Sequence, residues 1–120
     1  MARVLLADDD AAMREVASRV LGSDGHTVVV AQDGQEALEQ ASTARPPFDI
    51  LVTDVQMPVL DGISLAEQLL AARPGLRVVL MSGMQSEISR ADRLKSSTTH
   101  FLMKPFTLDQ LRAVVRRALA

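Results

Sequence analysis

Five short apolar runs, separated by segments with helical spacing, constrain the fold of this chain most strongly. The runs cover residues 4–7, 28–31, 50–52, 78–81 and 101–103. They are almost continuously hydrophobic and do not alternate with polar residues, which is typical of strands covered on both faces in a parallel sheet. The pattern therefore predicts a parallel sheet with helices packed on both sides.

The segments between these runs carry apolar residues at helical spacing. The clearest positions i, i+3, i+4, i+7 and i+8 are held by Met13, Val16, Ala17, Val20 and Leu21. Asp10 is suited to cap the start of this helix, and Gly22 stands at its expected end. Further helices are expected after Asp33, Asp61 and Thr107.

The fourth helix, expected over residues 87–95, is the weakest of the set. It offers only Ile88, Ala91 and Leu94 as apolar residues among many polar ones. Because so few side chains can anchor it to the sheet, we expect it to be the most mobile helix.

The alternation of strand and helix predicts a single α/β domain over residues 1–120, with no linker, repeat or low-complexity tract. Parallel strands joined by single helices form right-handed crossovers. We therefore expect a doubly wound (βα)5 sandwich of three layers. In such sheets ligands bind beyond the carboxyl ends of the strands, so the residues after each strand are the candidates for a site.

Composition excludes several classes of function. The 120 residues include no Cys, so a disulfide framework, thiol catalysis and Cys-ligated zinc are excluded. A net charge of -2 and only three aromatic residues, all Phe, argue against a nucleic-acid surface. No apolar run approaches the roughly 18 residues of a membrane span, and no charged-then-apolar leader opens the chain. We expect a cytoplasmic domain with no direct contact to nucleic acid or membrane.

Acidic residues follow two of the expected strands. Asp8 and Asp9 follow the first strand, and Asp54 follows the third. Ser82 follows the fourth strand and Lys104 the fifth. If the first and third strands are neighbours, the three carboxylates converge on one shallow cleft, flanked by the hydroxyl and the ammonium group.

Three carboxylates do not gather without a compensating charge. Two like charges about 4 Å apart repel by about 4 kcal/mol at an effective dielectric near 20. Either the acids take up protons or a cation lies among them, and Mg²⁺ is a hard ion that prefers such oxygen ligands. A carboxylate nucleophile, Mg²⁺, a lysine and a hydroxyl together are what transfer of a phosphoryl group to an acid requires.

Each of these residues also has an ordinary structural role when it is taken alone. Asp8 or Asp9 could cap a helix or be solvated, Asp54 could begin a turn, Ser82 could cap a turn, and Lys104 could be a surface charge. Their joint placement at one edge of the predicted sheet favours a functional site.

At these spacings the chain resembles a receiver domain of two-component response regulators, of the CheY-like superfamily, over essentially its whole length. The matching segments are Val4-Leu5-Leu6-Ala7-Asp8-Asp9-Asp10, Asp54-Val55-Gln56-Met57-Pro58 with Asp61-Gly62, Met81-Ser82-Gly83 and Lys104-Pro105-Phe106. The resemblance implies a flavodoxin-like sheet with strand order 2-1-3-4-5.

The resemblance also implies roles at the metal site. Asp54 would accept a phosphoryl group from a phosphohistidine on a histidine kinase or a histidine phosphotransfer protein. Mg²⁺, with Mn²⁺ as a possible substitute, would be held by Asp8, Asp9 and Asp54 and by the backbone carbonyl of Gln56.

The resemblance implies further roles in a conformational change that follows phosphorylation. Ser82 and Lys104 would hold phosphoryl oxygens, and Phe101 would be the switch aromatic. The peptide before Pro105 would be cis. The fourth helix, fifth strand and fifth helix would form the face that changes on phosphorylation. Such a domain is not an enzyme in isolation, because the phosphoryl group is added to and lost from its own side chain.

Alternatives remain at this point. Asp8-Asp9-Asp10 contains the Asp-x-Asp of an aspartate-nucleophile phosphatase of the dehalogenase type, although Ala12 stands where Thr or Val is expected. A receiver-like module that binds a partner without phosphorylation is another, although it would normally have lost Asp54 or Lys104. The Met81-Ser82-Gly83 segment and the arginines of the last helix, Arg112, Arg116 and Arg117, are compatible with a receiver from a hybrid histidine kinase.

Overall fold

The computed structural model describes residues 2–94 and 96–120. Strands and helices alternate in the order β1 (Arg3–Ala7), α1 (Ala11–Ser23), β2 (Thr27–Ala31), α2 (Gly34–Thr43), β3 (Ile50–Asp54), α3 (Gly62–Ala72), β4 (Arg77–Ser82), α4 (Gln85–Arg90), the 3-10 turn η1 (Ala91–Leu94), β5 (Thr99–Met103) and α5 (Leu108–Leu119). Every predicted apolar run lies within a strand.

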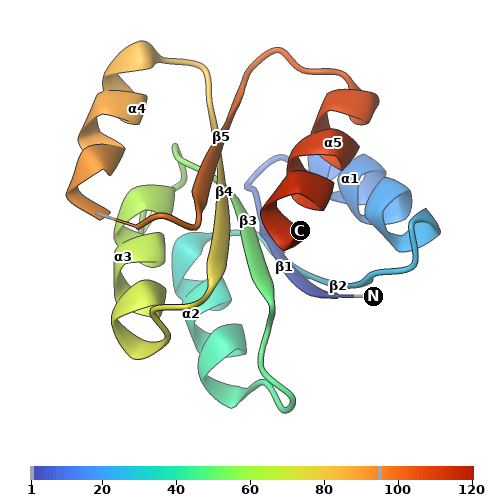
Figure 1. Cartoon of the computed structure of the whole chain (residues 1–120), viewed down its shortest axis with the longest axis horizontal. Coiled ribbons are helices and arrows are strands. Elements are labelled where there is room, and N and C mark those ends of the chain that lie inside the picture. The colour runs from blue at the N-terminus through green and yellow to red at the C-terminus, as the bar shows by residue number, and fades with distance from the viewer. Residues whose placement is uncertain (1, 95) are drawn as a thin grey trace.

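The strands form one parallel sheet in the order β2-β1-β3-β4-β5. Helices α1 and α5 cover one face, and α2, α3 and α4 cover the other (Figure 1). This confirms the predicted doubly wound (βα)5 sandwich and the strand order that the resemblance implied.

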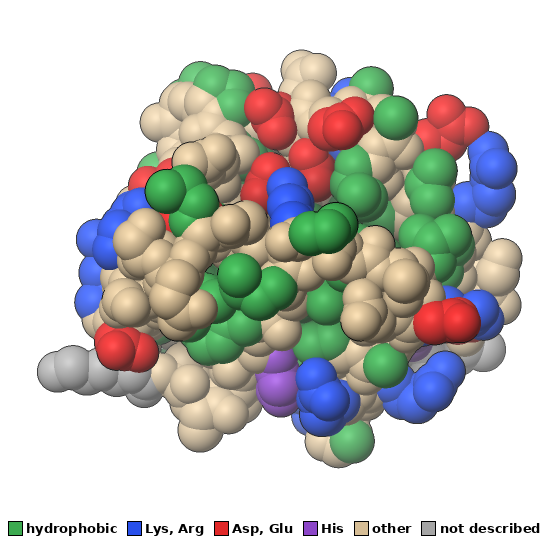
Figure 2. Space-filling model, turned by 90° about the horizontal axis from the view of Figure 1, so that it is seen from above, with side chains coloured by type: hydrophobic (Ala, Val, Ile, Leu, Met, Phe, Trp, Pro, Cys, Tyr) green, Lys and Arg blue, Asp and Glu red, His purple; other side chains and the backbone are tan. Residues whose placement is uncertain are grey.

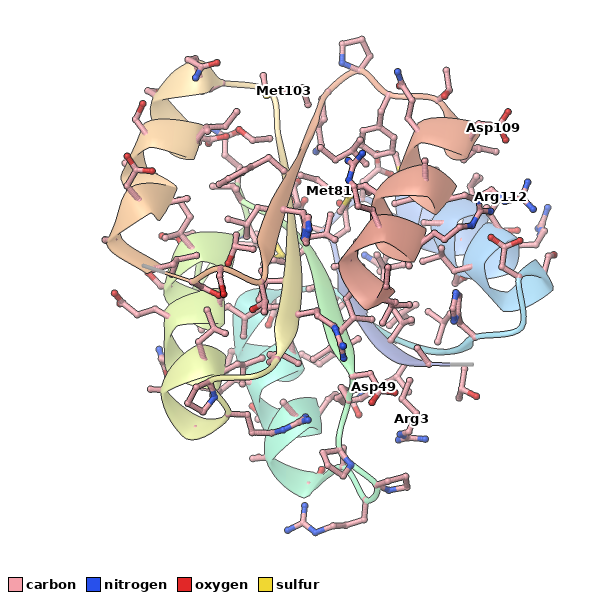
Figure 3. The ribbon with its side chains drawn as sticks, in the orientation of Figure 1. Arg3, Asp49, Met81, Met103, Asp109 and Arg112 are labelled. Carbon is pink, nitrogen blue, oxygen red and sulfur yellow. The ribbon has the colours of Figure 1, made fainter. Side chains whose placement is uncertain are left out.

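Two apolar cores lie on the two faces of the sheet, because successive side chains of a strand point to opposite sides. Leu5 and Leu51 pack toward α2 and α3, whereas Leu6 and Val52 pack toward α1 and α5. Met81, labelled in Figure 3, also belongs to the core on the α1 and α5 side. All of these side chains are at most 1% exposed. Burial on both faces explains why the strand sequences are continuously hydrophobic.

Side chains at the helix starts define where most helices begin. Asp10, Asp33, Asp61 and Thr107 each accept a hydrogen bond from a backbone N–H of the first turn of α1, α2, α3 and α5, respectively. Such caps contribute about 1 kcal/mol each. Helix α4 is different, because Met84 precedes it and supplies no side-chain hydrogen bond.

The fourth helical segment is shorter and less regular than the sequence predicted. Regular α-helix ends at Arg90 and the chain continues as η1, while Lys95, the last residue of the predicted helix, lies outside the described residues. Two arginines tie this segment to α3 and its start: Arg90 lies 3.5 Å from Asp61 and Arg93 lies 3.6 Å from Glu67. Ala91 is buried in the apolar core on this face and Leu94 packs against that core, so the two partly exposed ion pairs add to an apolar contact.

Helix α5 is fastened at the opposite end of the molecule. Arg112, on the side of α5 facing α1 (Figure 3), donates hydrogen bonds of 3.0 and 2.6 Å to the two carboxylate oxygens of Asp24, which ends α1. This ion pair lowers the pKa of Asp24. Within the described part of the chain, no helix is both long enough and apolar enough to cross a membrane.

Candidate functional site

Three carboxylates meet at the carboxyl ends of β1 and β3. Ala7 pairs with Thr53 in the sheet, so Asp8 and Asp54, the residues that follow them, come side by side. One carboxylate oxygen from each of Asp8, Asp9 and Asp54 lies within 4.8 Å of the others. Figure 2 looks onto this edge of the sheet and shows acidic side chains gathered around a basic one.

Asp8 is the most deeply buried member of this group, at 1% exposure. Its Oδ1 accepts a hydrogen bond of 2.9 Å from the Asp10 N–H, whereas its buried Oδ2 has no hydrogen-bond partner within the described chain. Burial raises the pKa of Asp8, and the charges of Asp54 and Asp9 raise it further, against the lowering effects of the Asp10 N–H and Lys104. Among the described residues Asp8 forms no salt bridge, and Lys104 pairs with Asp54 instead.

Asp54, the last residue of β3, is buried beside a lysine. Its side chain is 9% exposed, and its Oδ2 lies 3.0 Å from Lys104 Nζ. Burial raises the pKa of Asp54, and the hydrogen bond and charge of Lys104 partly offset that effect. The backbone of Asp54 packs against Gly62, where a Cβ would lie 2.2 Å from the Asp54 carbonyl oxygen. Glycine is therefore required for α3 to start this close to the site.

The residues of the cluster fit a divalent cation. An ion among the three acids would reduce their mutual repulsion and would meet the unpartnered Oδ2 of Asp8. Gln56 follows Asp54 by two residues and lines a shared pocket with Asp9 and Asp54. The predicted acids are therefore brought together, and Gln56 lies next to them.

Ser82 and Lys104 flank the acids from the neighbouring strands. Ser82 ends β4 and is 2% exposed, and its carbonyl accepts a 2.8 Å hydrogen bond from the Lys104 N–H at the end of β5. The Lys104–Pro105 peptide is cis, as the resemblance implied. Pairing of β4 with β5 thus sets the hydroxyl and the ammonium group at one edge.

Phe101 lies on β5, opposite Leu80 of β4, with 36% of its surface exposed. It lines a shallow pocket together with Ala91, Leu94 and Thr99, between η1 and β5. The aromatic ring thus stands at the surface beside the weakly attached fourth helical segment.

One residue at this site was not predicted from the sequence. Glu87, in the first turn of α4, is 5% exposed and accepts a hydrogen bond from the Ser82 hydroxyl. It shares a pocket with Asp9, Asp54 and Gln56. A glutamate at the start of a helix is ordinarily solvated, so nothing in the local sequence signalled its burial.

Comparison with known proteins identifies the family. The family model of the response regulator receiver domain matches residues 4–116. The chain belongs to this family of receiver domains. It is 40% identical over 117 residues to the response regulator MprA of Mycobacterium ulcerans, covering 98% of this chain and 50% of that protein. The receiver domain thus spans about half the length of the curated relatives it matches.

Solved receiver structures agree with the observed fold. The chemotaxis response regulator CheY4 of Vibrio cholerae superposes with a TM-score of 0.87 at 29% identity, covering 99% of each chain. The receiver domain of the Francisella response regulator 1452 gives 0.83 at 30% identity, covering 99% of this chain and 97% of that one. The family match favours a two-component receiver over the phosphatase alternative.

Proposed function

We propose that this receiver domain, acting as one unit over residues 1–120, accepts a phosphoryl group on the carboxylate of Asp54. The supporting observation is the position of Asp54, 3.0 Å from Lys104 and within 4.8 Å of the oxygens of Asp8 and Asp9. A nucleophile, a place for a cation and a fixed positive charge then occur at one point. The donor is the phosphohistidine of a histidine kinase or a histidine phosphotransfer protein.

In the transfer, an Asp54 carboxylate oxygen forms a bond to phosphorus while the bond from phosphorus to the donor histidine nitrogen breaks. The electron pair of that bond returns to the imidazole. Asp8, Asp9, Asp54 and the carbonyl of Gln56 would hold Mg²⁺, or Mn²⁺ in its place, which supplies charge stabilisation to the phosphoryl oxygens. Lys104 neutralises a further oxygen, and Ser82 supplies a hydroxyl donor.

The phosphoryl group stays on the chain's own side chain until water removes it, so the isolated domain turns over no external substrate. A phosphoryl group adds about two negative charges. We propose that it draws Ser82 and Lys104 toward Asp54 and changes the face formed by α4, β5 and α5. Phe101, Met103 and Leu108 are exposed apolar side chains of this face, at 36%, 41% and 42%.

The direct test is labelling by acetyl phosphate with Mg²⁺, followed by intact-mass measurement. The unaltered chain should gain one phosphoryl group, and Asp54→Asn or chelation of the metal should prevent it. Asp109→Asn, which removes a carboxylate with 93% side-chain exposure on α5, is the matched control and should label normally. Equal labelling of the Asp54→Asn protein would refute the assignment.

A further inference from the structure

Glu87 is a buried charged side chain to which the phosphoryl-transfer chemistry assigns no role. Among the described residues, the buried polar and charged side chains are Asp8, Thr53, Asp54, Ser82 and Glu87. All but Glu87 lie on or directly after a strand of the sheet. Glu87 reaches into this group from α4 on the outside, and it contacts Ser82 directly.

The Ser82 hydroxyl has a single proton to donate, while its oxygen can accept further hydrogen bonds. The oxygen accepts a 3.1 Å hydrogen bond from the Met84 N–H. The proton can be directed to a Glu87 carboxylate oxygen or to the Met84 carbonyl oxygen, 3.0 Å away. A carboxylate is the stronger acceptor, because hydrogen bonds to charged groups are roughly twice as strong as neutral ones.

We propose that Glu87 is a positioning residue that competes with the phosphoryl group for the Ser82 hydroxyl. The inference rests on the proposed function, since it takes the phosphoryl group to lie on Asp54. With Asp54 unmodified, Glu87 holds the hydroxyl toward α4. When Ser82 donates its proton to a phosphoryl oxygen instead, Glu87 loses its partner and the first turn of α4 loses its contact with β4.

Two features of the structure allow this exchange to move α4. The helix has no side-chain cap at its start, and its ion pair from Arg90 to Asp61 is 3.5 Å long between side chains that are 49% and 34% exposed. In addition, Glu87 and Asp54 line the same pocket, so a phosphoryl group on Asp54 brings charge of the same sign toward the Glu87 carboxylate. Repulsion and competition for the proton therefore act in the same direction.

The test is a double-mutant cycle on the binding of beryllofluoride with Mg²⁺, measured by calorimetry on the full chain. Glu87→Ala should tighten binding about tenfold, because the Ser82 hydroxyl no longer has to leave a charged acceptor. In a Ser82→Ala background the same Glu87→Ala change should have less than about a third of that effect, because no hydroxyl remains to be released. Asp92→Ala, which removes an exposed charge from the adjacent turn η1, should leave the affinity unchanged.

An equal effect of Glu87→Ala in both backgrounds would overturn the proposal, because it would show that charge alone acts. Weaker binding by the Glu87→Ala variant would also overturn it. Glu87→Gln provides a second variant that keeps the shape and an acceptor oxygen, and it should fall between the unaltered chain and Glu87→Ala.

A failure of the proposed function would give a different pair of results from a failure of the competition. Urea unfolding of the same four proteins measures the coupling between Ser82 and Glu87 without any phosphoryl analogue, and it should be favourable. If Ser82 and Glu87 are coupled in urea but beryllofluoride binding does not depend on Asp54, the phosphoacceptor assignment is refuted. The proposed competition for the Ser82 hydroxyl is then refuted as well. Asp54-dependent binding without dependence of the Glu87 effect on Ser82 would refute the competition alone.

Discussion

The ammonium group of Lys104 lies 3.0 Å from the carboxylate of Asp54, and this contact joins the carboxyl ends of β3 and β5 across β4. The pair is unequally buried, because the lysine side chain is 35% exposed and that of the aspartate only 9%. Lys104 can therefore turn toward a new anion at the site without being taken out of water, whereas Asp54 stays in place.

Replacement of Lys104 by Ala should separate phosphorylation from switching. The nucleophile and the three acids remain, so acetyl phosphate should still label Asp54. The added oxygens would lose their fixed cation, so the change in amide exchange over residues 85–101 on adding beryllofluoride should fall to a small fraction of that in the unaltered chain. An unchanged exchange response would contradict the role given to Lys104.

Replacement of Asp8 by Asn should stabilise the protein in EDTA at neutral pH. Burial raises the pKa of Asp8 in the folded state above its ordinary value of 3.8. Its stabilising contribution is then fully present below pH 3.8 and is lost as the pH rises through the folded-state pKa. The ionised acid therefore opposes folding at pH 7, and Asn should raise the free energy of unfolding there by on the order of 1 kcal/mol.

Urea titrations across pH check this expectation. The gain in the free energy of unfolding from Asp8→Asn should shrink as the pH falls through the raised pKa of Asp8, because the unsubstituted carboxyl takes up a proton there. Millimolar Mg²⁺ should reverse the order at pH 7, because the unaltered chain binds the ion in its folded state and gains stability from it. A constant advantage at every pH would show that ionisation is not its cause.

Gly62→Ala should be among the most damaging single-atom additions in the chain. The new Cβ would lie 2.2 Å from the Asp54 carbonyl oxygen, so α3 or the end of β3 must shift. We expect a loss of about 1–3 kcal/mol in the free energy of unfolding. Gly22→Ala in α1 is the matched control, because a Cβ at this position would have no heavy atom within 4 Å outside its own helical turn, and it should stabilise the protein by about 0.5–1 kcal/mol.

Val59→Gly should stabilise the loop between β3 and α3. Val59 has a φ of 73°, is 80% exposed, and sits in a turn closed by a 2.8 Å hydrogen bond from the Leu60 N–H to the Pro58 carbonyl. A β-branched residue is strained at this φ, whereas glycine adopts it freely. We expect the free energy of unfolding, measured by heat or urea denaturation, to rise by about 1 kcal/mol. Val16→Gly, at an exposed position inside α1, should lower stability instead.

Much of the fold was predictable because strands buried on both faces of the sheet have continuously apolar sequences. The residues of β1 and β3 are continuously apolar, and Asp10, Asp33, Asp61 and Thr107 mark helix starts by their chemistry. The strand order was not available from these patterns, since each strand looks alike, and it came from the family resemblance. The convergence of Asp8, Asp9 and Asp54 depended on that order.

The features that escaped prediction depend on contacts distant in sequence or on backbone conformation. Glu87 is buried beside Ser82, a contact with the end of β4 that a charged residue in a polar segment does not signal. The change from α4 to a 3-10 turn at Ala91 is a feature of the backbone that the apolar spacing of this segment did not specify. The left-handed φ of Val59 could not be predicted either, because valine rarely adopts this backbone conformation.

The polar attachment of α4 has a consequence for how such a chain can diverge. Ala91 and Leu94 pack on one apolar core, and the segment makes further polar contacts outside both cores through Arg90, Arg93 and Glu87. Each can be exchanged by one substitution without unfolding the sheet. On the proposed switch, the threshold at which the domain responds would therefore drift between relatives in small steps, while Asp54 and its neighbouring acids stay unchanged.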